Sequence, residues 1–265
     1  MAVWTDTGGV GSFATGTGTS STAVQDIQVP SNAVELVSIS GHVHNTAPAP
    51  AESMTGIFTI SGKDWQQGDY EFFSEIGGSH LGAINGTPYY AQPRYWPAYQ
   101  PVRPNSVLGL TYEAMDALAG NGQCMITCKW SDTPTGNARI NRKATRETAT
   151  STSTGSSLTL AGATNITAFT VAVSTTTVGA DDPSNGKIQV NSGNLLGNQT
   201  LELAYNLHGI EATSGQQICN LQHADVSIPV NPAMTNSVTF SSTLTELTAL
   251  GTAGQWAYSI SYNPV

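Results

Sequence analysis

Leu118–Trp130, which reads LAGNGQCMITCKW, has a second version at Leu250–Tyr262, which reads LGTAGQWAYSISY. The two versions lie roughly 131 positions apart. In both, the pattern indicates the end of a helix, a Gly-Gln turn and a strand in which apolar and polar residues alternate. This segment therefore predicts that two similar units follow one another in the chain.

Two further pairs of segments keep the same offset. Val34–Ile39 corresponds to Ile166–Val171, and Ile57–Gly62 corresponds to Ile188–Gly193. A length of 265 residues suits two domains of about 130 residues each. Charged residues make up only 10% of the chain, no apolar run approaches the roughly 20 residues of a membrane span, and Thr, Ser, Gly and Asn are frequent. This composition favours an all-β protein made of two β-sandwiches.

The duplication predicts the order of the domains. We expect an N-terminal arm over 1–25, a first sandwich over 26–138, a basic linker over 139–150 and a second sandwich over 151–265. The Gly/Thr/Ser-rich arm cannot bury enough apolar surface to order itself. It is therefore expected to lie against a neighbouring molecule or to be clasped by its own domain.

Each half is also expected to contain one short helix before its last strand. The first is predicted over Thr111–Ala119, with Gly120 at the position that ends helices. The second is predicted over Thr243–Leu250, where Thr243 and Glu246 have the spacing of a capping box.

The distribution of charge is uneven. The net charge of −9 disfavours a surface that generally adheres to nucleic acid, and we expect no specific recognition of nucleic acid. Four of the nine basic residues nevertheless lie in one stretch: Arg139, Arg142, Lys143 and Arg146. Either this stretch is a solvated linker, or it presents a basic spot to an anionic surface such as lipid headgroups or packaged nucleic acid.

Residues 87–104 form a long segment rich in proline and aromatic residues. Loops of this length usually have a function or lie in an interface. Three interpretations remain open: a cap on its own sandwich, a contact with a neighbouring subunit, or a surface that stacks on sugars. The aromatic residues are Tyr89, Tyr90, Tyr95, Trp96 and Tyr99.

The sequence contains no nucleophile elbow, no phosphate-binding glycine loop and no His-Glu-x-x-His motif. We assign no catalytic, cofactor-binding or metal-binding residue, and we expect no enzyme activity. The best set for a hydrolase cleft is acidic and lies near Trp65 and Tyr70, although ordinary loop acids are the favoured interpretation. Its members are Asp64, Asp69, Glu71 and Glu75.

Three cysteines cannot form a complete disulfide framework, and Cys124 and Cys128 are expected to be buried on one strand. No secretory signal is visible at the N-terminus. We therefore expect a protein that is made and assembled inside a cell.

The repeated segments carry a resemblance to a known family. Ala117–Gly122 and Ala249–Gly254 precede the last strand of each half, and Ile60–Lys63 and Val190–Gly193 are strands that run into a turn. In this pattern the chain resembles the double jelly-roll major capsid proteins of tailless icosahedral viruses, the tectivirus, corticovirus and adenovirus lineage. It is most similar to the small corticovirus-type members.

The resemblance implies a structural role in a virion. It predicts a homotrimer that forms a pseudo-hexagonal tile, contacts with neighbouring capsomers and with minor capsid or vertex proteins, and assembly in the host cytoplasm. It also suggests that the stretch from Arg139 to Arg146 faces an internal membrane or the genome. The alternatives are a glycan-binding pair of sandwiches, a minor capsid or spike protein, and a glycan hydrolase.

Overall fold

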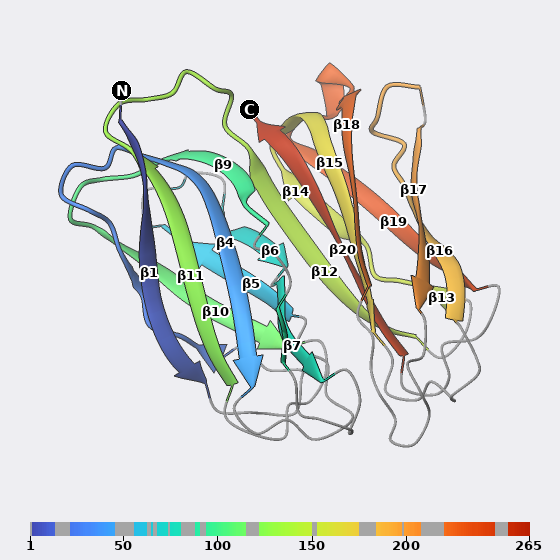
Figure 1. Ribbon diagram of the computed structural model, residues 1–265. Coiled ribbons are helices and arrows are strands. Elements are labelled where there is room, and N and C mark those ends of the chain that lie inside the picture. Colours follow the sequence, from blue (N-terminus) through green and yellow to red (C-terminus); the bar gives the residue numbers. More distant parts are fainter. Residues whose placement is uncertain are drawn as a thin grey trace.

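The structure is a computed structural model. It describes residues 2–13, 22–45, 56–62, 65, 68–73, 75–80, 88–90, 94–114, 122–149, 153–174, 184–197, 199–207, 220–246 and 254–265. Within these ranges the regular elements are strands, apart from the single 3-10 turn η1 (Pro232–Met234). They form two β-sandwiches that stand side by side (Figure 1).

The first sandwich contains the strands from β1 to β11. Its outer sheet has the order β1–β11–β4–β7–β8, with β9 also paired to β4, and its second sheet has the order β2–β10–β5–β6, with β3 also paired to β10. The strands are β1 (Val3–Phe13), β2 (Thr22–Ala23), β3 (Ile27–Gln28), β4 (Glu35–Asn45), β5 (Gly56–Ser61), β6 (Tyr70–Phe73), β7 (Glu75–His80), β8 (Pro88–Tyr90), β9 (Trp96–Pro101), β10 (Val107–Ala114) and β11 (Gly122–Ser131).

The second sandwich contains the strands from β12 to β20. One sheet has the order β12–β20–β15–β18, and the other has the order β13–β19–β16–β17, with β14 also paired to β19. The strands are β12 (Asn141–Ala149), β13 (Ser153–Thr154), β14 (Leu158–Ala161), β15 (Ala163–Ser174), β16 (Ser184–Asn191), β17 (Thr200–Leu207), β18 (Asn220–Pro229), β19 (Ser237–Glu246) and β20 (Gly254–Pro264).

The two sandwiches have the same strand order. The sheet β1–β11–β4–β9 corresponds to β12–β20–β15–β18, and β2–β10–β5–β6 corresponds to β13–β19–β16–β17. Even an irregularity is repeated. Lys129 and Trp130 of β11 pair with Ser38 and Leu36 of β4, so Val37 between them has no partner in the register. In the same way, Ser261 and Tyr262 of β20 pair with Ala168 and Ile166 of β15, so Thr167 is passed over. Bulges are specific features of a fold. The predicted all-β pair of jelly rolls is therefore confirmed, and β7 and β8 are additions to the first one.

Each sandwich has its own apolar core. In the first core Phe58 stacks on Phe72 at 5.3 Å and meets Tyr112 at 4.7 Å between ring centroids. In the second core Trp256 stacks on Tyr258 at 6.1 Å. Burying each such ring stabilises the fold by roughly 1.5–3 kcal/mol relative to leaving it exposed. Inward-facing residues of both sheets thus supply the cores that the alternating pattern predicts.

The predicted helices are wrong over their described residues. Thr111–Ala114 belongs to β10, and Thr243–Glu246 belongs to β19. Leu110, Tyr112 and Leu244 are buried while their neighbours along the strand are half-exposed, which is the period of two that strands require. Residues 115–119 and 247–250, where the predicted helices end, lie outside the described residues.

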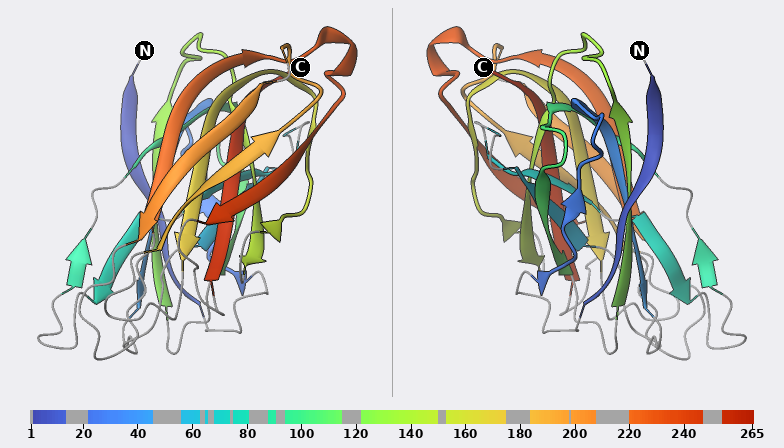
Figure 2. Two further views of the ribbon diagram at one scale, coloured as in Figure 1. Left: turned by 90° about the vertical axis from the view of Figure 1, so that its right-hand side faces the viewer. Right: turned by 90° about the vertical axis from the view of Figure 1, so that its left-hand side faces the viewer.

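Two predicted boundaries also change. Val3–Phe13 of the expected arm is strand β1, which pairs with β11, so this part of the arm is clasped by its own domain. The stretch 141–149 of the expected linker is strand β12, paired with β20 along its whole length. Figure 2 shows that both termini lie at the same end of the molecule.

Candidate functional site: the contact between the two sandwiches

The sheet β12–β20–β15–β18 is covered on both faces. Tyr258 and Ile260 of β20 point into the core of the second sandwich. Ala257 and Ser259 alternate with them and point the other way, yet both are fully buried. The first sandwich covers this face (Figure 1), and Ala172 and Ala257 pack into the core of the first sandwich. The small side chains let the two sandwiches approach closely.

Arg142 of β12 lies at the centre of this contact and is only 1% exposed. Its Nη1 donates to Thr170 Oγ1 and to Ser259 Oγ, each at 3.2 Å. Its guanidinium carbon lies 4.1 Å from the centroid of the Trp96 ring. Burial lowers the pKa of Arg142, and the nearby Tyr70 hydroxyl opposes that effect. Hydroxyls and an aromatic face, which attracts cations, thus surround this buried charge.

Trp96 of β9 is the partner of Arg142 from the first sandwich. Its ring is 1% exposed, and its Nε1 donates to the carbonyl oxygen of Phe73 at 3.1 Å. Arg94 lies 4.8 Å from the same ring. Tyr70 donates its hydroxyl to the carbonyl oxygen of Pro97 at 2.8 Å, and burial raises the pKa of Tyr70 to about 12. Trp96 is therefore held rigidly where the two sandwiches meet.

His223 of β18 extends the network to the surface. The Asp225 carboxylate can only accept, so His223 Nε2 donates to Asp225 Oδ1 at 3.1 Å. In the neutral imidazole Nδ1 then accepts from the Thr170 hydroxyl at 2.8 Å. The imidazole also meets the Trp96 ring edge-on at 5.5 Å. Burial lowers the pKa of His223, as do Arg94 and Arg142, while Asp225 opposes them. The network therefore favours a neutral imidazole.

Two acidic residues of the first sandwich attach to the edge strand β12. Glu71 Oε2 accepts the backbone N–H of Ala144 at 2.6 Å, and Glu71 Oε1 lies 3.6 Å from Lys143 Nζ. Arg146 Nη1 lies 3.6 Å from Glu113 Oε1. Burial raises the pKa of Glu71, against the effects of the Ala144 amide and Lys143. The first sandwich thus occupies the open edge that β12 would otherwise present.

The four basic residues predicted to face an anionic surface have different surroundings. Arg142 is buried inside the protein, so for this residue both the solvated-linker interpretation and the inward-facing assignment are wrong. Lys143 and Arg146 contact acidic residues of the first sandwich. Arg139 is half-buried and donates to Gln100 Oε1 at 3.3 Å. For the last three, contact with a membrane or genome stays a prediction.

The aromatic segment is less of a loop than predicted, because β8 and β9 lie within it. Trp96 contacts the second sandwich of the same chain. Tyr95 is half-buried, with Lys129 Nζ lying 3.9 Å from its ring centroid, and Tyr99 is half-buried with a φ of 47°. The side chains of Tyr89 and Tyr90 lie outside the described residues. A role of the described tyrosines in contacts between subunits stays a prediction.

Most polar groups of this contact bond to other groups of the protein. Glu71, from the acidic set considered for hydrolysis, has its carboxylate bonded to β12, and Asp69 is exposed. Asp64 and the side chain of Glu75 lie outside the described residues. Within the described ranges, no three His, Cys, Asp or Glu side chains gather in a way that suits a metal ion, and no helix has the length and apolarity to cross a membrane. Cys124 and Cys128 are buried, as predicted.

Sequence reasoning missed Tyr70, Thr170, His223 and Glu71 as parts of one contact. Thr170 gave one usable signal, because it is a polar residue within the apolar run of β15. A strand that is covered on both faces must provide hydrogen-bond partners for such a buried polar side chain. His223 had no local signal. Its partners lie in both sandwiches, so only the tertiary structure brings them together.

Comparison with known proteins supports the fold. No protein-family model and no curated protein matches the sequence. The structure of the major capsid protein of Sulfolobus turreted icosahedral virus is similar, with a TM-score of 0.50 and 10% identity, over 99% of this chain and 97% of that chain. The chain therefore has the double jelly-roll fold.

Two further solved structures are less similar. PNGF-II has a TM-score of 0.41 and 10% identity, over 92% of this chain and 59% of that chain. The major capsid protein P2 of bacteriophage PM2 has a TM-score of 0.40 and 9% identity, over 99% and 98%. At these scores neither structure adds to the assignment of the fold.

Proposed function

We propose that the protein is a major capsid protein whose trimers tile an icosahedral virion. The double jelly roll, which it shares with a viral major capsid protein, supports this role. The observation that carries the proposal is the contact within one chain. Two sandwiches of the same design meet through different faces, so the contact is heterologous, and heterologous contacts form closed rings when the rotation allows it. Three chains then place six sandwiches around one axis.

The repeated contact needs an open face on the first sandwich. The covered sheet β12–β20–β15–β18 corresponds to β1–β11–β4–β9, and no described strand of the chain covers the outer face of that sheet in Figures 1 and 2. Met125 on this face is 43% exposed, and Thr127 and Lys129 follow it on the same face of β11. We propose that the second sandwich of a neighbouring copy covers this face.

The register of the strands identifies an anchor for that contact. Glu71 pairs with Thr59 in the first sandwich, and Glu202 pairs with Gln189 at the corresponding position of the second. Glu71 accepts a backbone N–H of β12, which corresponds to β1. By this equivalence, Glu202 of one copy accepts a backbone N–H of β1 in the next. Glu202 is exposed within the single chain and contacts Lys187 and Gln189.

Light scattering after size-exclusion chromatography tests the trimer. We expect Met125→Glu to convert trimers into monomers, because it places a charge in the centre of the proposed contact. Met234→Glu is the matched control, because Met234 is 47% exposed on η1 of the second sandwich, away from this face. Glu202→Ala is expected to weaken the trimer while leaving the fold intact. A wild-type chain that stays monomeric, or Met125→Glu trimers as stable as the wild type, contradicts the proposal.

We also propose an orientation within the virion. Both termini lie at one end of the molecule (Figure 2). Leu196 and Met234 expose their apolar side chains at the same end. Leu196 donates its backbone N–H to Pro229, whose partner Asn165 pairs with Asn263, and Met234 precedes Thr235, which accepts from Ala163 opposite Pro264. We propose that this end faces inward, toward lipid of an internal membrane, and that minor capsid or vertex proteins are further partners. Flotation with anionic vesicles tests the lipid contact. The doubly substituted Leu196→Asp, Met234→Asp protein is expected to lose flotation while remaining trimeric, and unchanged flotation contradicts the orientation.

A further inference from the structure

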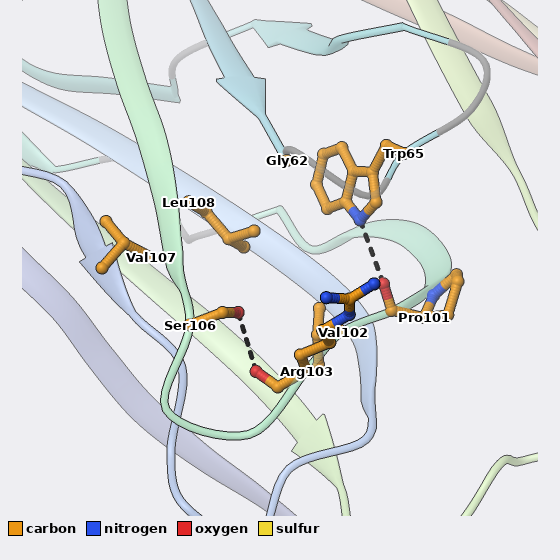
Figure 3. Close-up of a pocket in the computed structure, with 8 residues that line it drawn as sticks. All are labelled: Gly62, Trp65, Pro101, Val102, Arg103, Ser106, Val107 and Leu108. Atoms are coloured by element: carbon orange, nitrogen blue, oxygen red, sulfur yellow. Dashed lines mark hydrogen bonds between the residues drawn. The ribbon is translucent and has the colours of Figure 1, made fainter.

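The first sandwich contains a cavity of about 490 Å³ between the loop that follows β5 and the loop that joins β9 to β10 (Figure 3). Trp65 Nε1 donates there to the carbonyl oxygen of Pro101 at 3.0 Å, and Ser106 Oγ donates to the carbonyl oxygen of Arg103 at 2.7 Å. Arg103 also has an interaction partner within the protein. The polar side chains described in the lining of this cavity are therefore engaged within the protein.

The contact between the two sandwiches differs, because the structure leaves some of its buried polar atoms without a hydrogen-bond partner. Three of them are Arg142 Nε, Ser261 Oγ and Thr167 Oγ1. Arg142 of β12 pairs with Ser261 of β20, and Ser261 pairs with Ala168 of β15, the residue after Thr167. Residues that lie directly opposite one another on neighbouring strands have Cβ atoms about 5 Å apart. The register therefore places these three residues next to one another on three adjacent strands.

These atoms cannot turn to bulk solvent for a partner. Ser261 is 2% exposed and Arg142 is 1% exposed. Ser261 follows Ser259 by two residues on β20, so it lies on the same face, under the first sandwich. Buried polar side chains nearly always have a partner, either in the protein or in a bound molecule. Because Nε of arginine only donates and a hydroxyl can donate, the three atoms can donate three hydrogen bonds to one acceptor.

The charges around this position favour an anion over a water molecule as that acceptor. The Arg142 guanidinium is buried, and its contacts are with hydroxyls and with the ring of Trp96, which are all neutral. Arg94 lies over the same ring and adds a second cation. The Asp225 carboxylate bonds to His223, and its side chain is 90% exposed. A buried charge is costly unless an opposite charge pairs with it, so an acceptor with a negative charge is favoured.

We infer that one halide ion, in practice chloride, is bound between the two sandwiches by Arg142 Nε, Ser261 Oγ and Thr167 Oγ1. An anion of a single atom suits the site, because small residues such as Ala172 and Ala257 let the sandwiches approach closely here. The ion neutralises the buried guanidinium and joins β12, β20 and β15. This inference does not depend on the proposed assembly, because all three binding residues belong to one chain.

Anomalous diffraction from crystals of the full chain grown in sodium bromide tests the position of the ion. Bromide has the charge and nearly the size of chloride, and its anomalous signal distinguishes it from water. We expect one ordered bromide per chain, in contact with Arg142 Nε and Ser261 Oγ. Density at this position without an anomalous signal, as a water molecule would give, overturns the assignment.

Thermal denaturation in sodium chloride and in sodium gluconate at equal ionic strength tests the ion in solution. A ligand that binds only the folded protein raises its unfolding temperature, whereas gluconate is too large for the site. The wild type should therefore unfold at a higher temperature in chloride. Ser261→Ala should lose most of that shift. In gluconate the same substitution should not lower the unfolding temperature, because it removes a buried hydroxyl that has no partner there.

Two further variants connect the shift to this site. Thr167→Val replaces the hydroxyl by a methyl group of similar size and should lose the chloride shift as Ser261→Ala does. Ser40→Ala is the matched control, because Ser40 Oγ is also buried without a partner but lies on β4 of the first sandwich. It should keep the shift of the wild type. If Ser261→Ala keeps the full shift, or if Ser40→Ala loses it equally, the inference is wrong.

Discussion

The two sandwiches share a strand order and a bulge, but their outer faces have different environments. The face of β12–β20–β15–β18 carries Ala257, Ser259 and Thr170, all buried under the first sandwich. The corresponding face of the first sandwich carries Met125, which is 43% exposed. The repeated topology therefore specifies the scaffold, and the side chains on one face determine which copy of that scaffold packs against another domain of the same chain.

Single positions show how this difference arises. Trp96 pairs with Ile39 in the first sandwich, and Ala224 pairs with Phe169 at the corresponding place in the second. The Trp96 ring lies 4.1 Å from the guanidinium carbon of Arg142 in the second sandwich, whereas the methyl group of Ala224 is too short to make such a contact with another domain. A difference in side-chain size at equivalent positions thus gives the two sandwiches different contacts.

Among the substitutions that test this difference between the sandwiches, Trp96→Ala is expected to have the largest effect on stability. It removes a buried ring together with its contacts to Arg142 and His223, so it should lower the free energy of unfolding by about 3–5 kcal/mol. Chemical denaturation measures this loss. Tyr95→Ala, in the same segment but half-buried, should cost clearly less. Equal costs would show that the ring of Trp96 does not hold the sandwiches together.

Gly56 and Gly186 test whether the two scaffolds are equivalent. A Cβ at Gly56 would overlap the Tyr112 hydroxyl, and a Cβ at Gly186 would overlap the Tyr205 hydroxyl. We expect Gly56→Ala and Gly186→Ala each to cost about 1–3 kcal/mol, because both overfill a packed position.

Gly193→Ala is the control for this pair, because a Cβ there meets no atom within 4 Å. Its unfolding midpoint should stay close to that of the wild type. A large cost at only one of the two strand glycines would break the equivalence of the sandwiches at this point.

The sequence was sufficient to predict the strands of the two sandwiches, but it was insufficient to predict the contact between them. Alternation and the repeated segments identified β4, β5 and β11 together with their counterparts. The helix prediction failed because Thr243 and Glu246 match a capping box, although the alternating burial of Ser242 and Leu244 belongs to a strand. The basic stretch was misread because arginines are mostly exposed. The partners that make burial of Arg142 favourable, namely Thr170, Ser259 and the Trp96 ring, are all distant from it in sequence.

The contact between the sandwiches is expected to weaken in acid. The folded protein holds His223 neutral, since burial, Arg94 and Arg142 lower its pKa and only Asp225 raises it. A histidine with a lowered pKa takes up its proton more readily when unfolded. Its contribution to stability is therefore complete above the unfolded pKa of about 6.5 and is lost as the pH falls through the folded value.

Denaturation at pH 7.5 and pH 5 measures this effect. In the His223→Gln protein, the free energy of unfolding should differ less between the two pH values than it does in the wild type. Glu71, whose pKa is raised by burial, acts in the opposite direction because its protonation favours the folded state, so Glu71→Gln is the matching control. If the His223→Gln protein keeps the full pH dependence, the imidazole is not its source.

The smallest expected effect on stability concerns two ion pairs. Lys187 and Glu202 pair within the second sandwich, and Arg146 and Glu113 pair between the two sandwiches. Lys187 and Glu202 are 39% and 44% exposed in the single chain, whereas Arg146 and Glu113 are 14% and 34% exposed. Exposed pairs contribute about 0–1 kcal/mol and are screened by salt. In the monomeric Met125→Glu background, Lys187→Ala should therefore cost at most about 0.5 kcal/mol, and Arg146→Ala should cost more.

Denaturation at low and high salt separates the two pairs. The Lys187→Ala difference should vanish at about 1 M salt, where screening acts over only about 3 Å. The Arg146→Ala difference should persist, because the Arg146 side chain also fills space between the sandwiches and its truncation loses packing as well as charge. If both differences vanish with salt, the pair between the sandwiches contributes only surface electrostatics, and the stability of the contact rests on Trp96, Arg142 and the small residues around them.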